Sequence, residues 1–491
     1  MALWDVVGTA GETGPAGPKG DKGDKGDTGA TGADGAAGPA GADGAAGFYY
    51  ETADFKALTS LPLGSFGGLQ DELFRVQRVP TQTLPANSST VIDVALDYPV
   101  DTVNAFVMPC SPRSNNGGPT SNYNINPSKY LHTYITLPNG RTVRFDPTPE
   151  RAEANCPPCV VSAQVVESYA PVGDPYEIQV IGPLSVTVTG TNTSATGSLG
   201  ITLPDNAARG KVIFYEVGHT SGAVPREQGA IAFCHNTTSF TVLSAQPPAG
   251  NATTITYYAV WYKGSNWKVH HAYSGLLDAS DAGDIALKSL PPTAFSSGTF
   301  TADGAATSTS VSAWNRAFVA SGLSRGVDIS SNVSQYTCGV APAFLPGTGA
   351  DANNLSNINW LYNAAHSLSG QNLYAYVLED LGSSTKGMVV TRFVMTSPAD
   401  SSTVALDITS AGIVKPSEAL FTLRTISGMT GSTPSGATGT PPAGGTGGYT
   451  GGACLGEITS TTNFNLTVPY QAQLDKAYVT IVKLPRSVVA A

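Results

Sequence analysis

The sequence predicts a mostly β protein in which an extended N-terminal triple helix precedes two β-sandwich or jelly-roll-like domains, assembled as a homotrimer. Three observations lead to this prediction. Glycine occupies every third position from Gly8 to Gly47 without a break. Short runs of alternating apolar and polar residues follow from about residue 82, separated by turns rich in Gly, Pro, Asn and Ser. No long helical pattern interrupts these runs.

The glycine period has one structural explanation. It is the repeat of the collagen triple helix, because only a hydrogen side chain fits where three chains meet at the axis. A flexible Gly/Ala linker has no reason to keep strict register over so long a segment. The predicted stalk covers residues 8–47 and spans on the order of 120 Å at roughly 3 Å per residue. Its fourteen triplet glycines are Gly8, Gly11, Gly14, Gly17, Gly20, Gly23, Gly26, Gly29, Gly32, Gly35, Gly38, Gly41, Gly44 and Gly47.

Charged triplets in the stalk predict ion pairs between chains. The unit Lys-Gly-Asp occurs three times in succession, and its charged members are Lys19, Asp21, Lys22, Asp24, Lys25 and Asp27. In a staggered triple helix, this spacing sets an ammonium on one chain beside a carboxylate on its neighbour. Each exposed pair contributes only about 0–1 kcal/mol. The series on three chains nevertheless helps to fix their register.

The N-terminal residues and the overall charge argue against export, membrane insertion and nucleic-acid binding. Residues 1–7, which include Trp4, are interpreted as a docking segment for a larger assembly, with a frayed terminus as the alternative. They lack the basic region and apolar core of a signal peptide, which favours a virion component over an exported adhesin. No run of eighteen apolar residues occurs, so no membrane insertion is expected. The net charge of −10 argues against a nucleic-acid partner.

Residues 48–80 are interpreted as a neck between the stalk and the β domains. Leu69, Leu73 and Val76 have the spacing of a short helix that would end at Pro80, and three such helices would clamp the end of the triple helix. The same stretch also reads as a strand through residues 74–76. Both interpretations stay open on the sequence.

Two β domains are predicted, at residues 81–290 and 291–491. Alternating runs on both sides of Asn139-Gly140 indicate a hairpin. A composition shift near residues 278–310 places the boundary. The predicted strands cover residues 131–137, 142–145, 184–189, 211–217, 240–243, 255–262, 373–378, 388–395, 403–408 and 476–484.

A tract of Gly, Thr, Pro and Ser at residues 427–453 shows no apolar period. One interpretation is a long or disordered surface loop. The other is a tip loop that contacts a receptor, with Gly445, Gly448 and Tyr449 as candidate residues. The sequence does not separate the two.

The cysteines and histidines offer little chemistry. Cys156 and Cys159 have CxxC spacing, but a redox pair needs a βαβ setting and a zinc site needs a second ligand pair. Disulfides are expected, with free buried thiols as the alternative. His270 and His271 are adjacent and would point to opposite faces of a strand. They are expected at the surface or at an interface; copies meeting at a trimer axis would bind a metal. No catalytic residue, metal or cofactor is predicted.

Together, the short N-terminal segment, the Gly-Pro-Lys-Gly-Asp-Lys-Gly-Asp stalk and the large β domains resemble a fibre protein of a tailed bacteriophage. The resemblance rests on residues 8–47. It implies a trimeric structural protein of the virion, without enzymatic activity, that is assembled in the host cytoplasm. Its N-terminus would dock on another virion protein, and its β domains would bind a host-surface glycan or protein. A tail fibre, a capsid or collar decoration fibre and a cellular collagen-like surface protein remain alternatives.

Overall fold

Antiparallel strands make up nearly all of the regular structure in the part of the chain that the computed structural model describes. Every strand predicted from alternation falls on an observed strand, and the hairpin at Asn139-Gly140 is confirmed. The described residues are 72–114, 133–147, 152, 158–189, 194–220, 230–244, 252–276, 284–296, 299–302, 307–322, 341–343, 355–361, 372–382, 385–396, 403–427, 455–467 and 474–486.

The strands form four successive units that share one topology. In each unit the first, sixth and third strands form one sheet in the order 1-6-3, and the second, fifth and fourth form another in the order 2-5-4. Unit 1 comprises β1 (Phe74–Leu84), β2 (Ile92–Ala95), β3 (Ala105–Ser114), β4 (Thr133–Asn139), β5 (Thr142–Pro147) and β6 (Cys159–Ser168). Unit 2 comprises β7 (Gln179–Val188), β8 (Ser194–Ser198), β9 (Val212–Thr220), β10 (Ala230–Cys234), β11 (Ser239–Ser244) and β12 (Thr253–Trp261), with the short helix α2 (Asn206–Arg209) before β9.

Units 3 and 4 repeat this order with small additions. Unit 3 comprises β13 (Trp267–Leu276), β14 (Asp284–Lys288), β17 (Ala317–Gly322), β18 (Ala341–Ala343), β19 (Asn357–Leu361) and β20 (Asn372–Asp380). It also contains an inserted hairpin of β15 (Pro292–Ser296) and β16 (Thr299–Ala302), and pairing of β13 with β14 joins its two sheets. Unit 4 comprises β21 (Val389–Thr396), β22 (Thr403–Asp407), β23 (Ala419–Ser427), β24 (Leu455–Ile458), β25 (Asn463–Thr467) and β26 (Leu474–Lys483).

The strand register is also repeated. The first residue of the third strand lies opposite the end of the sixth strand in all four units, in the pairs Ala105 with Glu167, Val212 with Trp261, Ala317 with Glu379 and Ala419 with Lys483. The third strands also begin with similar residues, Ala-Phe-Val in units 1 and 3, Val-Ile-Phe in unit 2 and Ala-Leu-Phe in unit 4. The four units are therefore structural repeats of one another.

Successive positions of the third strand explain how each unit packs. Its third residue faces the second sheet of the same unit: the rings of Phe214 and Phe240 lie 5.2 Å apart, and those of Phe421 and Phe464 lie 5.1 Å apart. Its second residue points the other way. In all four units this second residue belongs to the largest buried cluster, and the four residues are Phe106, Ile213, Phe318 and Leu420.

The sixth strands of units 1 to 3 are buried on both faces at the centre of their 1-6-3 sheets, whereas β26 of unit 4 alternates between buried and partly buried positions. Residues 160–168 of β6, 255–260 of β12 and 374–380 of β20 are buried without interruption. The outer strands β2, β8 and β22 instead alternate between exposed and partly buried positions. A continuous apolar run and a strict alternation are the respective patterns of strands covered on two faces and on one.

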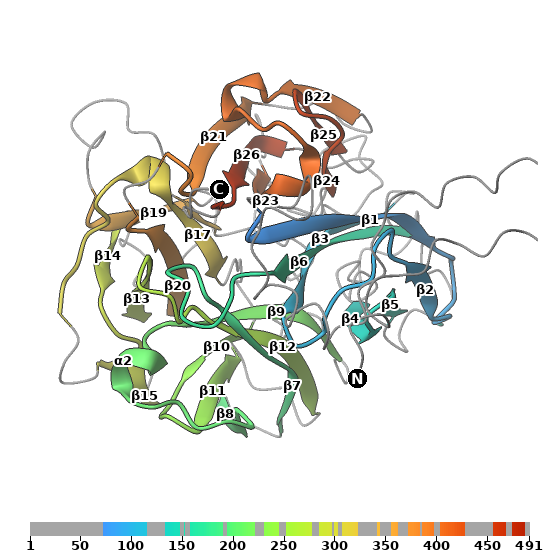
Figure 1. The fold of residues 1–491 in the computed structure, drawn as a ribbon. Helices are drawn as coiled ribbons and strands as arrows, with labels where there is room; N and C mark the ends of the chain where they lie inside the picture. Colours follow the sequence, from blue (N-terminus) through green and yellow to red (C-terminus); the bar gives the residue numbers. More distant parts are fainter. Residues whose placement is uncertain are drawn as a thin grey trace, which may run out of the picture.

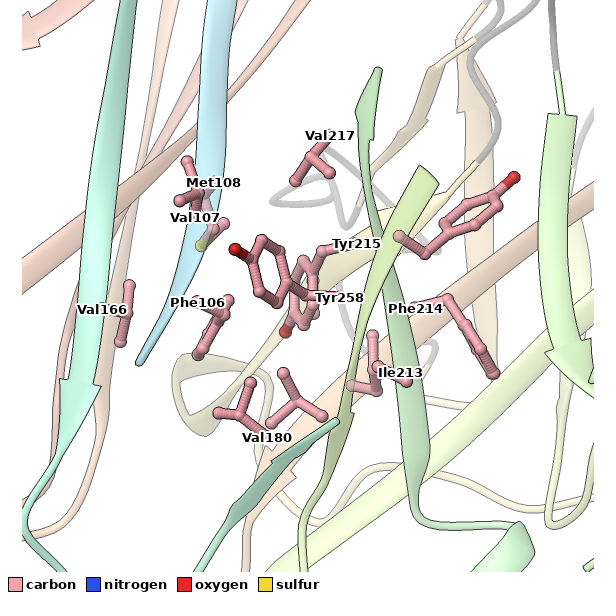
Figure 2. Packing of buried hydrophobic residues seen from close by; sticks show 14 of the residues in the cluster. Phe106, Val107, Met108, Val166, Val180, Ile213, Phe214, Tyr215, Val217 and Tyr258 are labelled. Carbon is pink, nitrogen blue, oxygen red and sulfur yellow. The ribbon is translucent and has the colours of Figure 1, made fainter. Parts of the chain in front are cut away.

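The four units follow one another around the molecule, and unit 4 closes against unit 1 (Figure 1). Between units 1 and 2 the rings of Phe106 and Tyr215 lie 4.9 Å apart (Figure 2). Units 2 and 3 meet where Phe233 stacks on Tyr374. Arg392 of unit 4 lies over Trp314 of unit 3. Gln164 of β6 closes the circuit, because its amide makes two hydrogen bonds of 3.0 Å with the backbone of Phe421.

The neck and the domain boundary differ in part from what the sequence predicts. Of the two interpretations of the neck, the strand through residues 74–76 is confirmed and the helix that would end at Pro80 is wrong: β1 runs from Phe74 through Pro80, because β6 supplies partners for its backbone, and residues 48–71 lie outside the described part of the chain. Pro80 falls at the irregularity in the register between Val79 and Gln82, a position that tolerates a missing amide. The boundary proposed at residue 290 falls inside unit 3, where β13 pairs with β20.

The close approach of two sheets in unit 4 provides a test of this packing. A Cβ atom on Gly456 would lie 2.7 Å from the ring of Phe464 and 2.8 Å from that of Phe421. Gly456→Val should therefore lower the free energy of unfolding by about 1–3 kcal/mol, the cost of overpacking. Thr403→Val, at an exposed position of the same unit, is the matched control. Equal urea midpoints for the two variants would contradict the packing described.

Candidate functional site at the junction of the four units

The segments that connect the units converge on one buried carboxylate. Asp380, at the end of β20, has no exposed surface. It accepts hydrogen bonds from the hydroxyl of Tyr176, which lies between units 1 and 2, and from the guanidinium of Arg316 at 3.0 Å. The backbone amides of Gly382 and Met388, between units 3 and 4, donate to it at 2.7 and 2.6 Å. Asp380 thus joins three parts of the chain that are far apart in sequence.

Aromatic side chains connect this carboxylate to the start of β1. The ring of Trp267 lies 5.2 Å from that of Tyr176 and 6.1 Å from that of Phe74, both edge-to-face. Its indole nitrogen donates a 3.0 Å hydrogen bond to the carbonyl of Tyr176. Burial, together with the charge and the hydrogen bond of Asp380, raises the pKa of Tyr176 well above its ordinary value, so this hydroxyl remains a donor.

The two ends of the described chain meet beside this cluster. Glu72 forms an isolated bridge with Arg486 and an ion pair with Lys415. Arg486 also pairs with the buried Glu418, and its backbone amide donates to the carbonyl of Lys386 at 2.8 Å. Glu72, before β1, and Arg486, after β26, are therefore joined by a backbone bridge, and ion pairs tie both of them to residues 415–418.

The adjacent histidines are both fully buried, so the expectation of surface or interface positions is wrong, and His271 lies between units 2 and 3. His271 contacts the carbonyl of Gly210 at 2.9 Å and the hydroxyl of Tyr374 at 2.8 Å. Because a carbonyl only accepts, Nε2 carries the proton and Nδ1 accepts from the tyrosine. Burial lowers the pKa of His271 to about 3, so the ring is neutral.

His270 points to the opposite face and pairs with Glu379 at 2.6 Å. Burial lowers the pKa of His270, which therefore donates as a neutral ring. Burial opposes ionisation of Glu379, but hydrogen bonds from His270 and Ser312 outweigh it and hold the pKa of this carboxyl below its ordinary value. Glu167 occupies the same place in unit 1 and also binds the loop before the third strand, through the amide of Asp101. The pair of His270 with Glu379 therefore has a structural role.

Two cysteines in the described part of the chain are free thiols. Cys110 and Cys234 are buried, and burial raises the pKa of each to about 12, so neither thiolate forms near neutral pH. Cys159 is the first residue of β6, and its proposed partner Cys156 lies outside the described residues. The disulfide between them stays a prediction.

The other predicted functional residues also lie outside the described part of the chain. These are Trp4, the stalk glycines and Lys-Gly-Asp residues, and the candidate receptor residues Gly445, Gly448 and Tyr449. The described residues contain no group of three His, Cys, Asp or Glu side chains that would hold a metal ion. None of the described helices is long and apolar enough to cross a membrane.

The comparisons with known proteins concern the N-terminal segment alone. Residues 6–51 match the family described as collagen triple helix repeat (20 copies). A collagen triple helix repeat implies self-association of three chains. No curated protein matches the chain, and no solved structure matches it. The protein is thus a mostly β chain with a collagen-like N-terminal segment, in keeping with a structural, fibrous role.

Loss of the negative charge of Asp380 should destabilise the junction. Asp380→Asn removes the charge that Arg316 and the two amides require, so the free energy of unfolding should fall by about 3 kcal/mol. Asp93→Asn is the control, because the Asp93 pair with Arg144 is exposed and should contribute little. Urea denaturation at neutral pH measures both. Equal midpoints for the two variants would show that Asp380 does not hold the junction.

The buried histidines predict loss of stability in mild acid. A histidine with a lowered pKa binds its proton more readily in the unfolded chain, so stability is complete above about pH 6.5 and falls as the pH drops toward the folded value. For His271 the loss between pH 7.5 and about pH 5 should reach about 2 kcal/mol, from 1.36 kcal/mol per pKa unit. His270 adds to it in the same direction. Urea midpoints of wild type and His271→Gln across this range test the prediction; a slope unchanged in the variant would refute it.

Proposed function

We propose that the chain is a structural fibre protein of a tailed bacteriophage, in which a trimeric collagen-like stalk presents three β heads for attachment to the host surface. The observation that carries the proposal is the unbroken glycine period at residues 8–47, followed in the same chain by a large β head. The Lys-Gly-Asp triplets, which resemble those of phage fibres, support the virion setting. The localisation proposed is the exposed surface of the particle.

The architecture of the head suits a rigid adhesive part. The third strand of every unit contributes to the largest buried cluster, and the outer strands β2, β8 and β22 offer exposed side chains on this fixed scaffold. Loops and exposed strands held by such a scaffold are where binding residues concentrate in proteins. Three heads on one stalk also gain avidity from weak individual sites. The proposed partners are a host glycan or protein and, through residues 1–7, another virion protein.

The proposal assigns no enzymatic activity to the head. His270 and Glu379 are the most enzyme-like pair in the described part of the chain, and both are fully buried and engaged with each other. The hydroxyl of Ser312 contacts the carboxylate of Glu379 rather than the histidine ring, so it is not activated as a nucleophile.

The stalk generates a prediction about assembly. Gly29→Val places a side chain at the crowded axis and should lower the melting temperature of the triple helix and expose the stalk to trypsin. Ala30→Val, one position along, points outward and is the matched control. Circular dichroism and sedimentation equilibrium of the full-length variants report the melting and the chain number. A trimer with equal melting in both variants would contradict the triple helix.

Immunogold electron microscopy of intact phage particles tests the function itself, with antibody raised against the head. Gold at the tail or baseplate is the expected result for a host-attachment fibre. Gold over the capsid or collar would make the protein a decoration fibre with accessory adhesion. Labelling of cell envelopes without labelling of any particle would overturn the virion assignment in favour of a cellular collagen-like surface protein.

A further inference from the structure

The exposed large apolar side chains of the head are unevenly distributed. Eight such residues occur in the described part of the chain, and six of them lie on segments that contact the two chain ends or the residues next to them. We call these six residues the junction rim: Tyr98, Val103, Val172, Leu381, Val389 and Val414. The remaining two, Val91 and Val394, lie on unit 1 beside β2 and within β21 of unit 4.

Three rim residues stand on the side of unit 1. Val103 precedes Asn104, whose carbonyl binds the amide of Ser168 opposite Phe74. Val172 is 90% exposed and belongs to the turn that follows Tyr169, whose amide binds the carbonyl of Leu73. The ring of Tyr98 lies 5.1 Å from the guanidinium of Arg75. All three are therefore anchored to residues 73–75 at the start of β1.

The other three rim residues stand on the side of units 3 and 4. Val414 is 70% exposed and precedes Lys415, the ion-pair partner of Glu72. Val389 opens β21, three residues after Lys386, whose carbonyl binds the amide of Arg486. Leu381 follows the buried Asp380, and its amide donates to the carbonyl of Asn266, next to Trp267. Both groups of residues thus surround the point at which the chain reaches the head.

Four carboxylates around the junction are paired with cations, which lowers the repulsion between the rim and a like-charged copy. Glu72 pairs with Lys415, Glu418 with Arg486, Asp380 with Arg316 and Glu177 with Lys263. The whole chain carries a net charge of −10, which would otherwise keep copies apart. An apolar surface with neutralised charges favours a second copy of the same chain over a charged partner.

Tethering makes even a small apolar surface sufficient. The glycine period ends at Gly47, and 24 residues separate it from Glu72. Fully extended, they reach at most about 80 Å, so the heads on one stalk stay at an effective concentration on the order of millimolar. We propose that the junction rim is the surface through which the three heads of one trimer contact one another. This inference rests on the proposed trimeric stalk.

The test compares two charge-matched double variants of the full-length protein. Val172→Glu/Val414→Glu places two carboxylates in the rim, and Val91→Glu/Val394→Glu places two at the exposed valines outside it. Sedimentation equilibrium counts the chains, and negative-stain electron microscopy records whether the three heads touch. We expect trimers in all three proteins, touching heads in wild type and in the control variant, and loss of head contact in the rim variant.

The outcomes separate this inference from the function on which it rests. A monomeric wild type would overturn the trimeric fibre and the rim with it. Trimers with separated heads in wild type would leave the stalk intact and refute the rim contact. Touching heads in both double variants would also refute it, and would mean that other surfaces hold the heads together.

Discussion

The head depends on a carboxylate that has no access to water. Asp380 is an ionisable group at a fully buried position, and such a group is tolerated only when charge-assisted hydrogen bonds replace its hydration. Its donors come from the connection between units 1 and 2, from unit 3 itself and from the connection between units 3 and 4. If any of these segments moved away, the carboxylate of Asp380 would lose hydrogen-bond donors. Asp380 therefore holds the connecting segments together at one point.

The shared core makes the units interdependent. The start of the third strand is buried on both faces in all four units, and a strand of this kind has no stable existence with one face in water. The second residue of each third strand therefore packs toward neighbouring units, while the third residue packs within its own unit. Four small units that would each be marginal alone share the largest buried cluster by closing on one another, and two further clusters lie in unit 3 and mainly in unit 4.

The place where the chain reaches the head links the fold to the proposed fibre. The first strand begins beside the last one, and the outer sheets lie away from that point (Figure 1). The rim residues lie on segments that contact the same point. In a trimer joined at its stalk, this arrangement keeps the apolar contacts near the axis. The outer sheets remain available for a host surface.

The sequence alone determined the local structure: the glycine period, the strands and the hairpin at Asn139-Gly140 depend on steric and periodic rules that act between near neighbours. The structural repeat leaves only a short trace in the sequence, Ala-Phe-Val at 105–107 and again at 317–319, and the loops between equivalent strands differ in length. Which strands pair was decided only by tertiary structure, because pairing of β13 with β20 joins residues about a hundred positions apart. The tertiary structure also decided the burial of His270, His271 and Asp380, because the hydrogen-bond partners of these side chains come from segments far away in the sequence.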